Sequence, residues 1–265
     1  MSRRNASRFQ LATVAVALLI TAFIVMVLVG VVTHSPLAVL IESLFSEEIQ
    51  FAIRLSIITS IISTLLCILI AVPVAYALAR YTFPGKTAIN MLMDIPMALP
   101  PLVAGVGLLL FFGVSPIGKS LAAVGLTFVF TPLGIIVAQF FVNLPYMLRV
   151  TRSTFQGVNP RYEYVAKTLG CTDAQAFWRV TLPMSSNGLL AGSVITWSKG
   201  IGEFGAALML AGATRMKTET LPLSLFLNMS IGKLEYAISA ATILILISIA
   251  SLYIFERYGG ATHVY

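Results

Sequence analysis

Charged residues are scarce in this chain. Asp, Glu, Lys and Arg together make up 10% of its 265 residues, while 58% are hydrophobic. Soluble globular proteins contain about 25% charged residues, so this chain has too few to keep so much apolar surface in water. The composition excludes an ordinary soluble domain and predicts an all-α protein of a lipid bilayer.

Cysteine and histidine are also rare, with two residues of each. Cys67 lies in an apolar run and Cys171 in a polar stretch, so they are poor disulfide partners, and their spacing fits no metal site. His34 and His263 lie near the two ends of the sequence without partners for metal binding or general-base catalysis. We expect no metal site, no catalytic centre and no cofactor bound by this chain.

Six stretches without charge approach or exceed the roughly 20 apolar residues that cross a bilayer. They are residues 11–33, 55–79, 95–118, 120–148, 180–198 and 236–255. We expect the fourth helix to begin near Pro132 and the fifth to extend over 186–211, where Lys199 and Glu203 interrupt the apolar sequence. The first stretch is longer than the apolar part of a signal peptide, and we predict a retained anchor helix followed by core helices over about 52–255.

The net charge of +7 is distributed in a way that predicts orientation. With the N-terminus inside, the cytoplasmic side holds Arg3, Arg4, Arg8, Arg80, Lys86, Arg149, Arg152, Arg161, Lys167, Arg179 and Arg257. The outer side holds Arg54, Lys119, Arg215, Lys217 and Lys233. This bias follows the positive-inside rule, and six spans then place both termini in the cytoplasm. The sequence shows no compact basic patch, so we expect no nucleic-acid partner.

Two segments on the predicted outer side have a local pattern. Residues 36–50 carry apolar residues at helical spacing, which predicts one short helix along the membrane surface. Residues 214–235 carry mixed charges, which predicts an outer loop. Each segment fits either a solvated face or contact with a partner.

The polar stretch 152–184, between two apolar runs, has strong local signals. Asn159 can cap a helix whose first residue is Pro160, and Gly170 stands where a left-handed residue ends such a helix. Apolar residues of this helix recur at the spacing of one face: Tyr162, Val165, Ala166 and Leu169.

A second short amphipathic stretch follows, with Ala174, Phe177 and Trp178 on one face. The apolar side of this two-helix element either rests on the membrane helices of the same chain or docks into a groove on a cytoplasmic partner. Periodicity alone favours neither.

The spacing from Gly170 over nine residues to Val180-Thr181-Leu182-Pro183 resembles that of ABC-importer permeases, whose pattern is EAA, three residues, Gly, nine residues, Ile-x-Leu-Pro. The triplet reads Tyr164-Val165-Ala166 here, with Glu163 one position early. The resemblance implies a single permease domain of the type I importer architecture over 1–265. It also implies that the helix inserts into a cleft of a separate ATPase subunit, where ATP and Mg are bound. The coupling residues carried over are Tyr162, Glu163, Tyr164, Val165, Ala166, Lys167, Leu169, Gly170, Leu182 and Pro183.

Three further segments resemble permeases for tetrahedral oxyanions, chiefly molybdate and tungstate, with sulfate permeases as close relatives. They are DIPMALPPLVAGVGLL at 94–109, SKGIGEFGAALMLAG at 198–212 and TETLPLSLF at 218–226. The resemblance implies an importer with two copies of this chain, two ATPase subunits and an external oxyanion-binding protein. The chain itself is then no enzyme, and it lies in the cytoplasmic membrane.

Lys199 and Glu203 stand four residues apart within the fifth predicted span, where a charge costs about 2.5–3.5 kcal/mol to insert. They either form a structural pair on one helix face, or Lys199 attracts an anion while Glu203 orients it. Three nearby residues carry hydroxyl groups, which we interpret either as contacts between membrane helices or as groups that line the anion pathway: Ser193, Thr196 and Ser198. Prolines at 96, 100 and 101 are expected to break the third helix, and Pro145 interrupts the fourth.

Residues 113–120, GVSPIGKS, match the P-loop pattern letter for letter. A working P-loop lies between a strand and a helix of a soluble α/β domain, whereas this segment follows a membrane helix. We interpret it as an outer loop rich in turn residues. A sulfate or thiosulfate permease, an ATP-independent secondary transporter and a membrane scaffold or channel remain as alternative functions.

Overall fold

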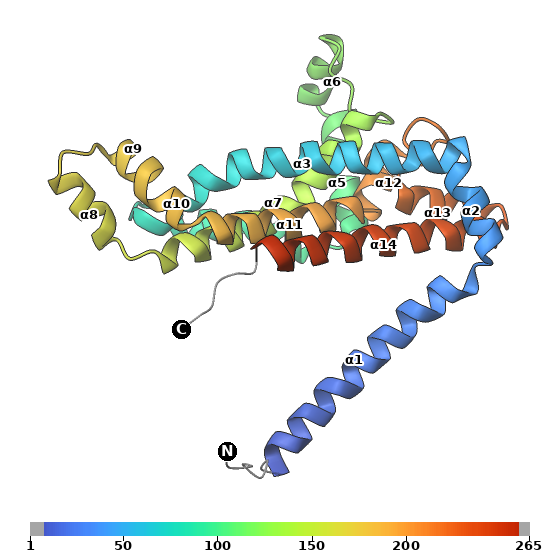
Figure 1. Cartoon of the computed structure of the whole chain (residues 1–265). Helices are drawn as coiled ribbons and strands as arrows, with labels where there is room; N and C mark the ends of the chain where they lie inside the picture. Colours follow the sequence, from blue (N-terminus) through green and yellow to red (C-terminus); the bar gives the residue numbers. More distant parts are fainter. Residues whose placement is uncertain (1–7, 260–265) are drawn as a thin grey trace.

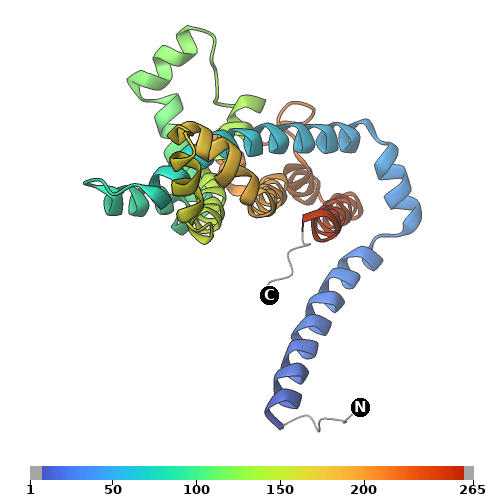
Figure 2. The same ribbon diagram turned by 60° about the vertical axis from the view of Figure 1, so that its left-hand side comes forward.

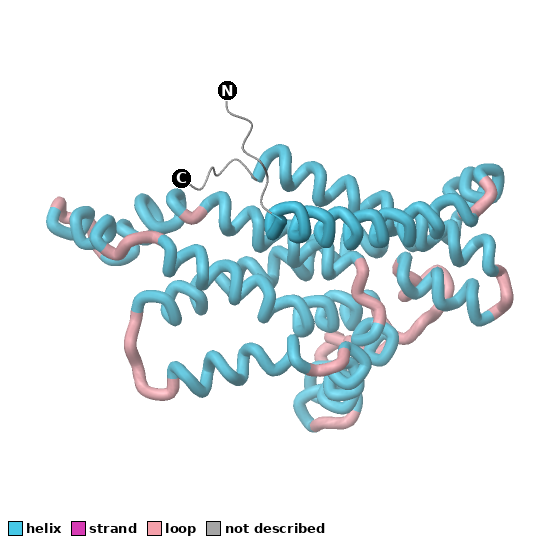
Figure 3. Tube along the Cα trace, turned by 90° about the horizontal axis from the view of Figure 1, so that it is seen from below, coloured by secondary structure: helices cyan, strands magenta, loops and turns pink. Residues whose placement is uncertain are grey.

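The computed structural model describes residues 8–259, and within this range all regular structure is helical (Figure 3). Arg3, Arg4 and His263 lie outside the described residues. The helices are α1 (Arg8–His34), α2 (Leu37–Phe45), α3 (Glu47–Arg80), α4 (Lys86–Ala98), α5 (Pro101–Gly113), α6 (Pro116–Ala123), α7 (Pro132–Gly157), α8 (Arg161–Thr168), α9 (Asp173–Ala176), the π-helix η1 (Phe177–Thr181), α10 (Leu182–Met184), α11 (Ser186–Ile201), α12 (Gly205–Ala211), α13 (Leu221–Ser230) and α14 (Leu234–Gly259).

A bundle of α3, α7, α11 and α14 forms the body of the protein (Figure 1). Small residues such as Ala71, Ala75 and Ala138 are fully buried where the helices meet, which lets the helix axes approach closely. Large apolar side chains cover much of the outside, as a lipid-facing surface requires. The protein is thus arranged as a membrane protein, with small residues inside and large apolar residues outside.

Buried polar groups also connect the bundle helices. The side-chain amide of Gln139 on α7 donates to the carbonyl of Gly200 on α11, at 2.9 Å, and to the hydroxyl of Thr59 on α3, at 3.3 Å. Gly200 has no side chain to separate α11 from this amide. In an apolar medium such bonds have no competition from water, so they fix the relative position of three helices.

Four described helices are long and apolar enough to cross a membrane: α1, α3, α7 and α14. The third predicted span is instead the pair α4 and α5, which meet at a 110° bend. The predicted break is confirmed at Pro100, whereas Pro96 and Pro145 lie inside helices. The fifth predicted span is divided into α11 and α12. Six spans and two cytoplasmic termini therefore stay predictions.

The first helix stands apart from the bundle (Figures 1 and 2). None of its residues is buried, and it contacts α14 near its C-terminal end, where the hydroxyls of Ser35 and Ser239 lie 3.1 Å apart. The prediction of one helix over 36–50 was partly wrong. Helix α2 ends at Phe45, and the side chain of Ser46 then caps α3 by accepting from the backbone of Ile49 at 3.3 Å.

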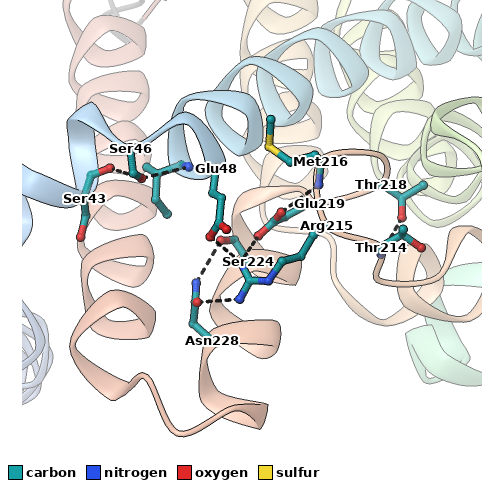
Figure 4. A network of polar contacts seen from close by, with 11 residues as sticks. Ser43, Ser46, Glu48, Thr214, Arg215, Met216, Thr218, Glu219, Ser224 and Asn228 are labelled. Carbon is teal, nitrogen blue, oxygen red and sulfur yellow. Dashed lines mark hydrogen bonds and ion pairs between the residues drawn. The ribbon is translucent and has the colours of Figure 1, made fainter.

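The segment after α12 is held by a polar network (Figure 4). Arg215 donates to Glu48 at the start of α3, at 2.5 Å, and to Asn228 on α13, at 2.9 Å. The fully buried carboxylate of Glu219 accepts from Arg215 and from the backbone of Met216. The predicted loop over 214–235 is therefore confirmed only up to residue 220, because α13 follows as a helix whose first half is buried.

Glycines in α5 give a matched test of the packing between α5 and α12. A Cβ on Gly105 would stand 2.8 Å from the Cα of Ala206, whereas a Cβ on Gly107 would meet nothing within 4 Å. We expect Gly105→Ala to destabilise the protein by about 1–3 kcal/mol, because the backbone of α12 would have to move. Gly107→Ala should be neutral or slightly stabilising. Thermal unfolding in detergent measures both, and equal midpoints would contradict this packing.

Candidate coupling site and transport pathway

The short helix α8 lies within one residue of its predicted bounds. The side chain of Asn159 accepts from the backbone of Arg161 at 3.0 Å. At the other end Gly170 has a φ of +91°, and its N–H donates to the carbonyl of Lys167 while that of Cys171 donates to Ala166. This is a Schellman cap, which requires a residue that tolerates the left-handed region. The predicted left-handed end of the helix at Gly170 is confirmed, and the helix begins at Arg161, one residue later than predicted.

A second short helical element follows α8. The side chains of Thr172 and Gln175 form a capping box at the start of α9, and an ion pair between Lys167 and Asp173 joins α8 to α9. Phe177 turns inward, with its ring 4.7 Å from that of Tyr76, whereas Trp178 is exposed. The prediction that these two residues share a face with Ala174 was wrong, because Phe177 packs against α3 whereas Ala174 and Trp178 are exposed.

The outward side of α8 is apolar and exposed. It carries Tyr162, Tyr164, Val165 and Leu169, the last with 81% of its surface accessible. Ala166 was predicted to belong to this face but is buried against the protein. We call the four exposed residues the coupling surface. A cluster of large apolar side chains on a polar segment beyond the end of the bundle is typical of a protein-binding surface (Figure 1).

A buried ion pair attaches α8 to the bundle. The carboxylate of Glu163 accepts from Arg80 Nε at 2.7 Å, from the Thr181 hydroxyl at 2.7 Å and from the Tyr76 hydroxyl at 3.0 Å. The side chains of Arg80 and Glu163 are 8% and 6% exposed. Arg80 also donates to the carbonyl of Val158 at 2.8 Å. One carboxylate thus connects the end of α3, helix α8 and η1.

The charge state of Glu163 follows from these contacts. Burial acts to raise the pKa of its carboxyl group, but hydrogen bonds from Thr181, Arg80 and Tyr76 outweigh it and hold the pKa below its ordinary value of 4.5. Glu163 is therefore ionised at neutral pH, and its partner Arg80 keeps the buried site neutral overall.

Glu163 was predicted as a coupling residue, but its partners were not predicted. Arg80 was interpreted only as a topogenic charge, and Tyr76 and Thr181 were not singled out. Arg80 lies 83 residues from Glu163, and no pattern in one sequence connects them. The other two predicted coupling residues, Leu182 and Pro183, lie in α10 at the start of the return into the bundle.

The pathway candidates on α11 point in different directions. Ser193 lines an apolar groove of about 350 Å³ between α3 and α11. Thr196 is buried within the bundle, and the hydroxyl of Ser198 lies 3.1 Å from that of Ser251 on α14. The structure therefore does not bring these three hydroxyls together into one site.

Of the two alternatives for Lys199 and Glu203, a pair on one helix face is contradicted, because α11 ends at Ile201 between them. The Glu203 carboxylate instead accepts from the backbone N–H of Ala206 at 2.9 Å and caps α12. The ammonium group of Lys199, an exposed residue, lies 4.2 Å from the centre of the Tyr146 ring on α7. The carboxyl group of Glu203 is thus buried, while Lys199 is accessible.

The two helix breaks lie against each other. A cavity of about 360 Å³ is lined by Pro100, Pro101 and Leu102 from one break and by residues 202–205 from the other. A Cβ on Gly205 would stand 3.0 Å from the backbone nitrogen of Leu102, so a larger residue would push the breaks apart. Irregular backbone at membrane depth is tolerated where it lines a cavity, as here.

The P-loop-like residues 113–120 cover the end of α5 and the start of α6, and the Ser115 side chain caps α6 by accepting from Gly118. No strand precedes them within residues 8–259. The segment thus lacks the strand–loop–helix geometry of a P-loop.

The buried ion pair predicts a specific pH dependence. A carboxyl group whose folded pKa is lowered contributes stability above its unfolded pKa and loses it as pH falls through the folded value. At neutral pH we expect Glu163→Gln to cost roughly 3–5 kcal/mol. The difference between wild type and variant should shrink below about pH 4.5. Thermal unfolding between pH 3 and 7 measures it. A constant difference over this range would contradict the assignment.

Comparisons with known proteins agree with this architecture. Residues 68–259 match the family model described as a binding-protein-dependent transport system inner membrane component. The chain is 37% identical over 193 residues to the sulfate transport system permease protein CysT of Salmonella typhimurium, covering 70% of this chain and 69% of that protein. It is 36% identical over 180 residues to the molybdenum transport system permease protein ModB of Mycobacterium tuberculosis, covering 68% of each.

A solved structure has the same fold. A chain of a bacterial ABC transporter involved in the import of alginate superposes with a TM-score of 0.70, at 16% identity, over 94% of both chains. The predicted resemblance to type I ABC-importer permeases is thereby confirmed. This chain belongs to the family of binding-protein-dependent transport system inner membrane components, the permease subunits of ABC importers, and is a multi-pass protein of the cytoplasmic membrane.

Proposed function

We propose that this chain is the permease subunit of an ATP-driven importer that carries a tetrahedral oxyanion, molybdate or tungstate, into the cytoplasm. The observation that supports this most is the coupling surface on α8, held rigidly by Glu163 and Arg80. A transporter that works without an ATPase has no need of such a surface. ATP and Mg then belong to the partner ATPase, and this chain has no catalytic role of its own.

The mechanism follows from how α8 is attached. A partner ATPase that moves the coupling surface also moves Glu163, and through Arg80 the inner end of α3. Because a buried ion pair resists separation, the movement passes to the bundle rather than being lost in a flexible loop. ATP binding would draw two such helices together, and hydrolysis would release them.

The number of subunits follows from the number of coupling surfaces. One chain presents one α8, whereas two ATPase subunits enclose ATP between them, so two copies of this chain are proposed with the pathway along their two-fold axis. An external oxyanion-binding protein would deliver the substrate. One solved alginate transporter of this fold is described in complex with a pentasaccharide-bound periplasmic protein, which supports a partner of this kind.

An anionic substrate fits the charges at membrane depth. Lys199 is accessible on α11, whereas the nearby carboxylate of Glu203 is buried and used by the backbone. A cation at this depth attracts an anion in the pathway. The relatives are named for molybdenum and sulfate transport, which are both oxyanion systems.

Sulfate or thiosulfate is the second candidate, and a specific observation favours it. Two CysT sulfate permeases are 37% identical to this chain, against 36% for ModB. The molybdate and tungstate proposal rests on the segments at 94–109, 198–212 and 218–226. Both candidates share geometry and charge, so substrate competition has to decide between them.

Substitution on the coupling surface tests the ATPase partnership. We expect Leu169→Asp to abolish co-purification of the ATPase, because a charge would be desolvated at the interface, while the permease still folds. Thr87→Asp introduces the same charge at an exposed position near the start of α4 and should leave the complex intact. If Leu169→Asp retained the ATPase in equal amounts, the coupling surface would be wrongly assigned.

Uptake into vesicles tests the substrate. The complete importer should accumulate radiolabelled molybdate only with ATP inside the vesicles, and unlabelled tungstate should compete better than sulfate. Stronger competition by sulfate or thiosulfate would support the second candidate. ATP-independent uptake by the permease alone would contradict the proposal in both forms and indicate a secondary transporter.

A further inference from the structure

Helix α4 packs mainly on α7, and two polar contacts fasten it there. Arg149 Nη2 donates to Asp94 Oδ2 at 2.9 Å, and Arg152 Nη1 donates to Asn90 Oδ1 at 2.7 Å. The two pairs lie on successive turns of two antiparallel helices. They are near the inner end of the bundle, since α8 and the coupling surface follow directly after α7.

This cluster has more positive charge than its partners neutralise. Two guanidinium groups face one carboxylate and one neutral amide, and the Nε of Arg152 is buried without any hydrogen-bond acceptor. A cavity of about 40 Å³ is lined by both arginines, Asp94 and Asn90. A buried charged donor without an acceptor is unfavourable, so the cluster has unused capacity for an anion.

Arg149 and Arg152 extend a row of basic residues that begins at Lys199 on α11. Tyr146, Arg149 and Arg152 follow one another at three-residue spacing, so they lie on neighbouring turns of one side of α7. The ammonium group of Lys199 lies over the first of them, at the ring of Tyr146. Basic groups therefore extend from below the cavity at the two helix breaks toward the cytoplasmic end.

The charges of these residues indicate that they do not face lipid. The side chains of Arg149 and Asp94 are 59% and 44% exposed, and charges at this depth face water or protein rather than hydrocarbon. An ion pair accessible to solvent is weak and exchanges readily. Asp94 can thus leave Arg149 when another anion arrives.

We propose that Arg149 and Arg152 form an exit site for the transported tetrahedral oxyanion, with Asp94 occupying Arg149 when the site is empty. This inference rests on the proposed oxyanion transport. The planar guanidinium groups present paired N–H donors that match the oxygens of a tetrahedral anion. Return of the Asp94 carboxylate displaces the anion, so the site attracts the substrate without retaining it.

A lipid phosphate offers the same chemistry, because it is also a tetrahedral oxyanion near the inner membrane surface. The two sources differ in what they require. A headgroup site depends on the presence of anionic lipid, whereas an exit site binds the free ion in a bilayer of phosphatidylcholine alone. The experiment below separates them.

The test uses the permease–ATPase complex in nanodiscs of phosphatidylcholine, with and without phosphatidylglycerol, and radiolabelled molybdate or sulfate as probe. Arg149→Gln and Arg152→Gln should weaken binding from the cytoplasmic side by about tenfold or more, the scale of a lost hydrogen bond to a charged group. Asp94→Asn should strengthen binding and slow release, because the competing carboxylate is gone. Lys86→Gln, at the start of the same helix, is the matched control and should bind like wild type.

Each outcome either supports or overturns the proposed exit site. Weakened binding in the two arginine variants, with tighter binding in Asp94→Asn and wild-type ATPase association, supports the exit site. Unchanged oxyanion binding overturns it, and variants that alter only the effect of phosphatidylglycerol assign the cluster to a lipid headgroup. Arg149→Lys retains a charge and should recover part of the binding, whereas a misfolded variant would not. If wild type itself transports neither anion, the proposed function fails and not merely this site.

Discussion

Glu163 places a negative charge in a site that is almost closed to water, and Arg80 compensates it from the end of a helix 34 residues long. Two hydroxyl groups complete the coordination of the carboxylate, so none of its partners is free to leave without cost. The coupling surface depends on this arrangement. Without it, α8 would be a short helix on two loops, and its apolar face would have no fixed direction relative to the membrane helices.

The same principle recurs deeper in the protein. Gln139 connects α3, α7 and α11 through the backbone of Gly200, and Glu203 caps α12 where the chain breaks. Helices interrupted at membrane depth leave backbone groups without partners. Gln139 supplies a donor for the carbonyl of Gly200, and Glu203 supplies an acceptor for the N–H of Ala206. Rigid contacts therefore surround the cavity at the breaks. By contrast, the accessible charges of Lys199, Arg149 and Asp94 lie on surfaces that can exchange partners.

Helix ends and breaks could be predicted from the sequence, whereas contacts between residues far apart in the sequence could not. Asn159, Gly170 and Pro100 each act on their immediate neighbours, so the start and end of α8 and the break before α5 could be located from residue type alone. Glu163 could be assigned to the coupling segment, but its inward direction depends on Arg80, which only the folded chain brings near. A pair of Lys199 and Glu203 assumed a continuous helix. Gly200 and Gly202 between them indicated that the helix could end there, as it does at Ile201.

We propose above all that α8 transmits movement of a partner ATPase to the bundle through a rigid attachment. Spin labels would be attached to a cysteine introduced by Thr168→Cys in both copies, with Cys67 and Cys171 replaced by serine. Pulsed electron paramagnetic resonance would then report the distance between the two α8 helices. In the complete importer this distance should be shorter with ATP bound than without it. In a complex with Arg80→Gln the labels should still approach, but with a broader distribution, because the helix is no longer fixed to α3. A distance that does not respond to ATP, in a complex that hydrolyses it, would contradict the claim.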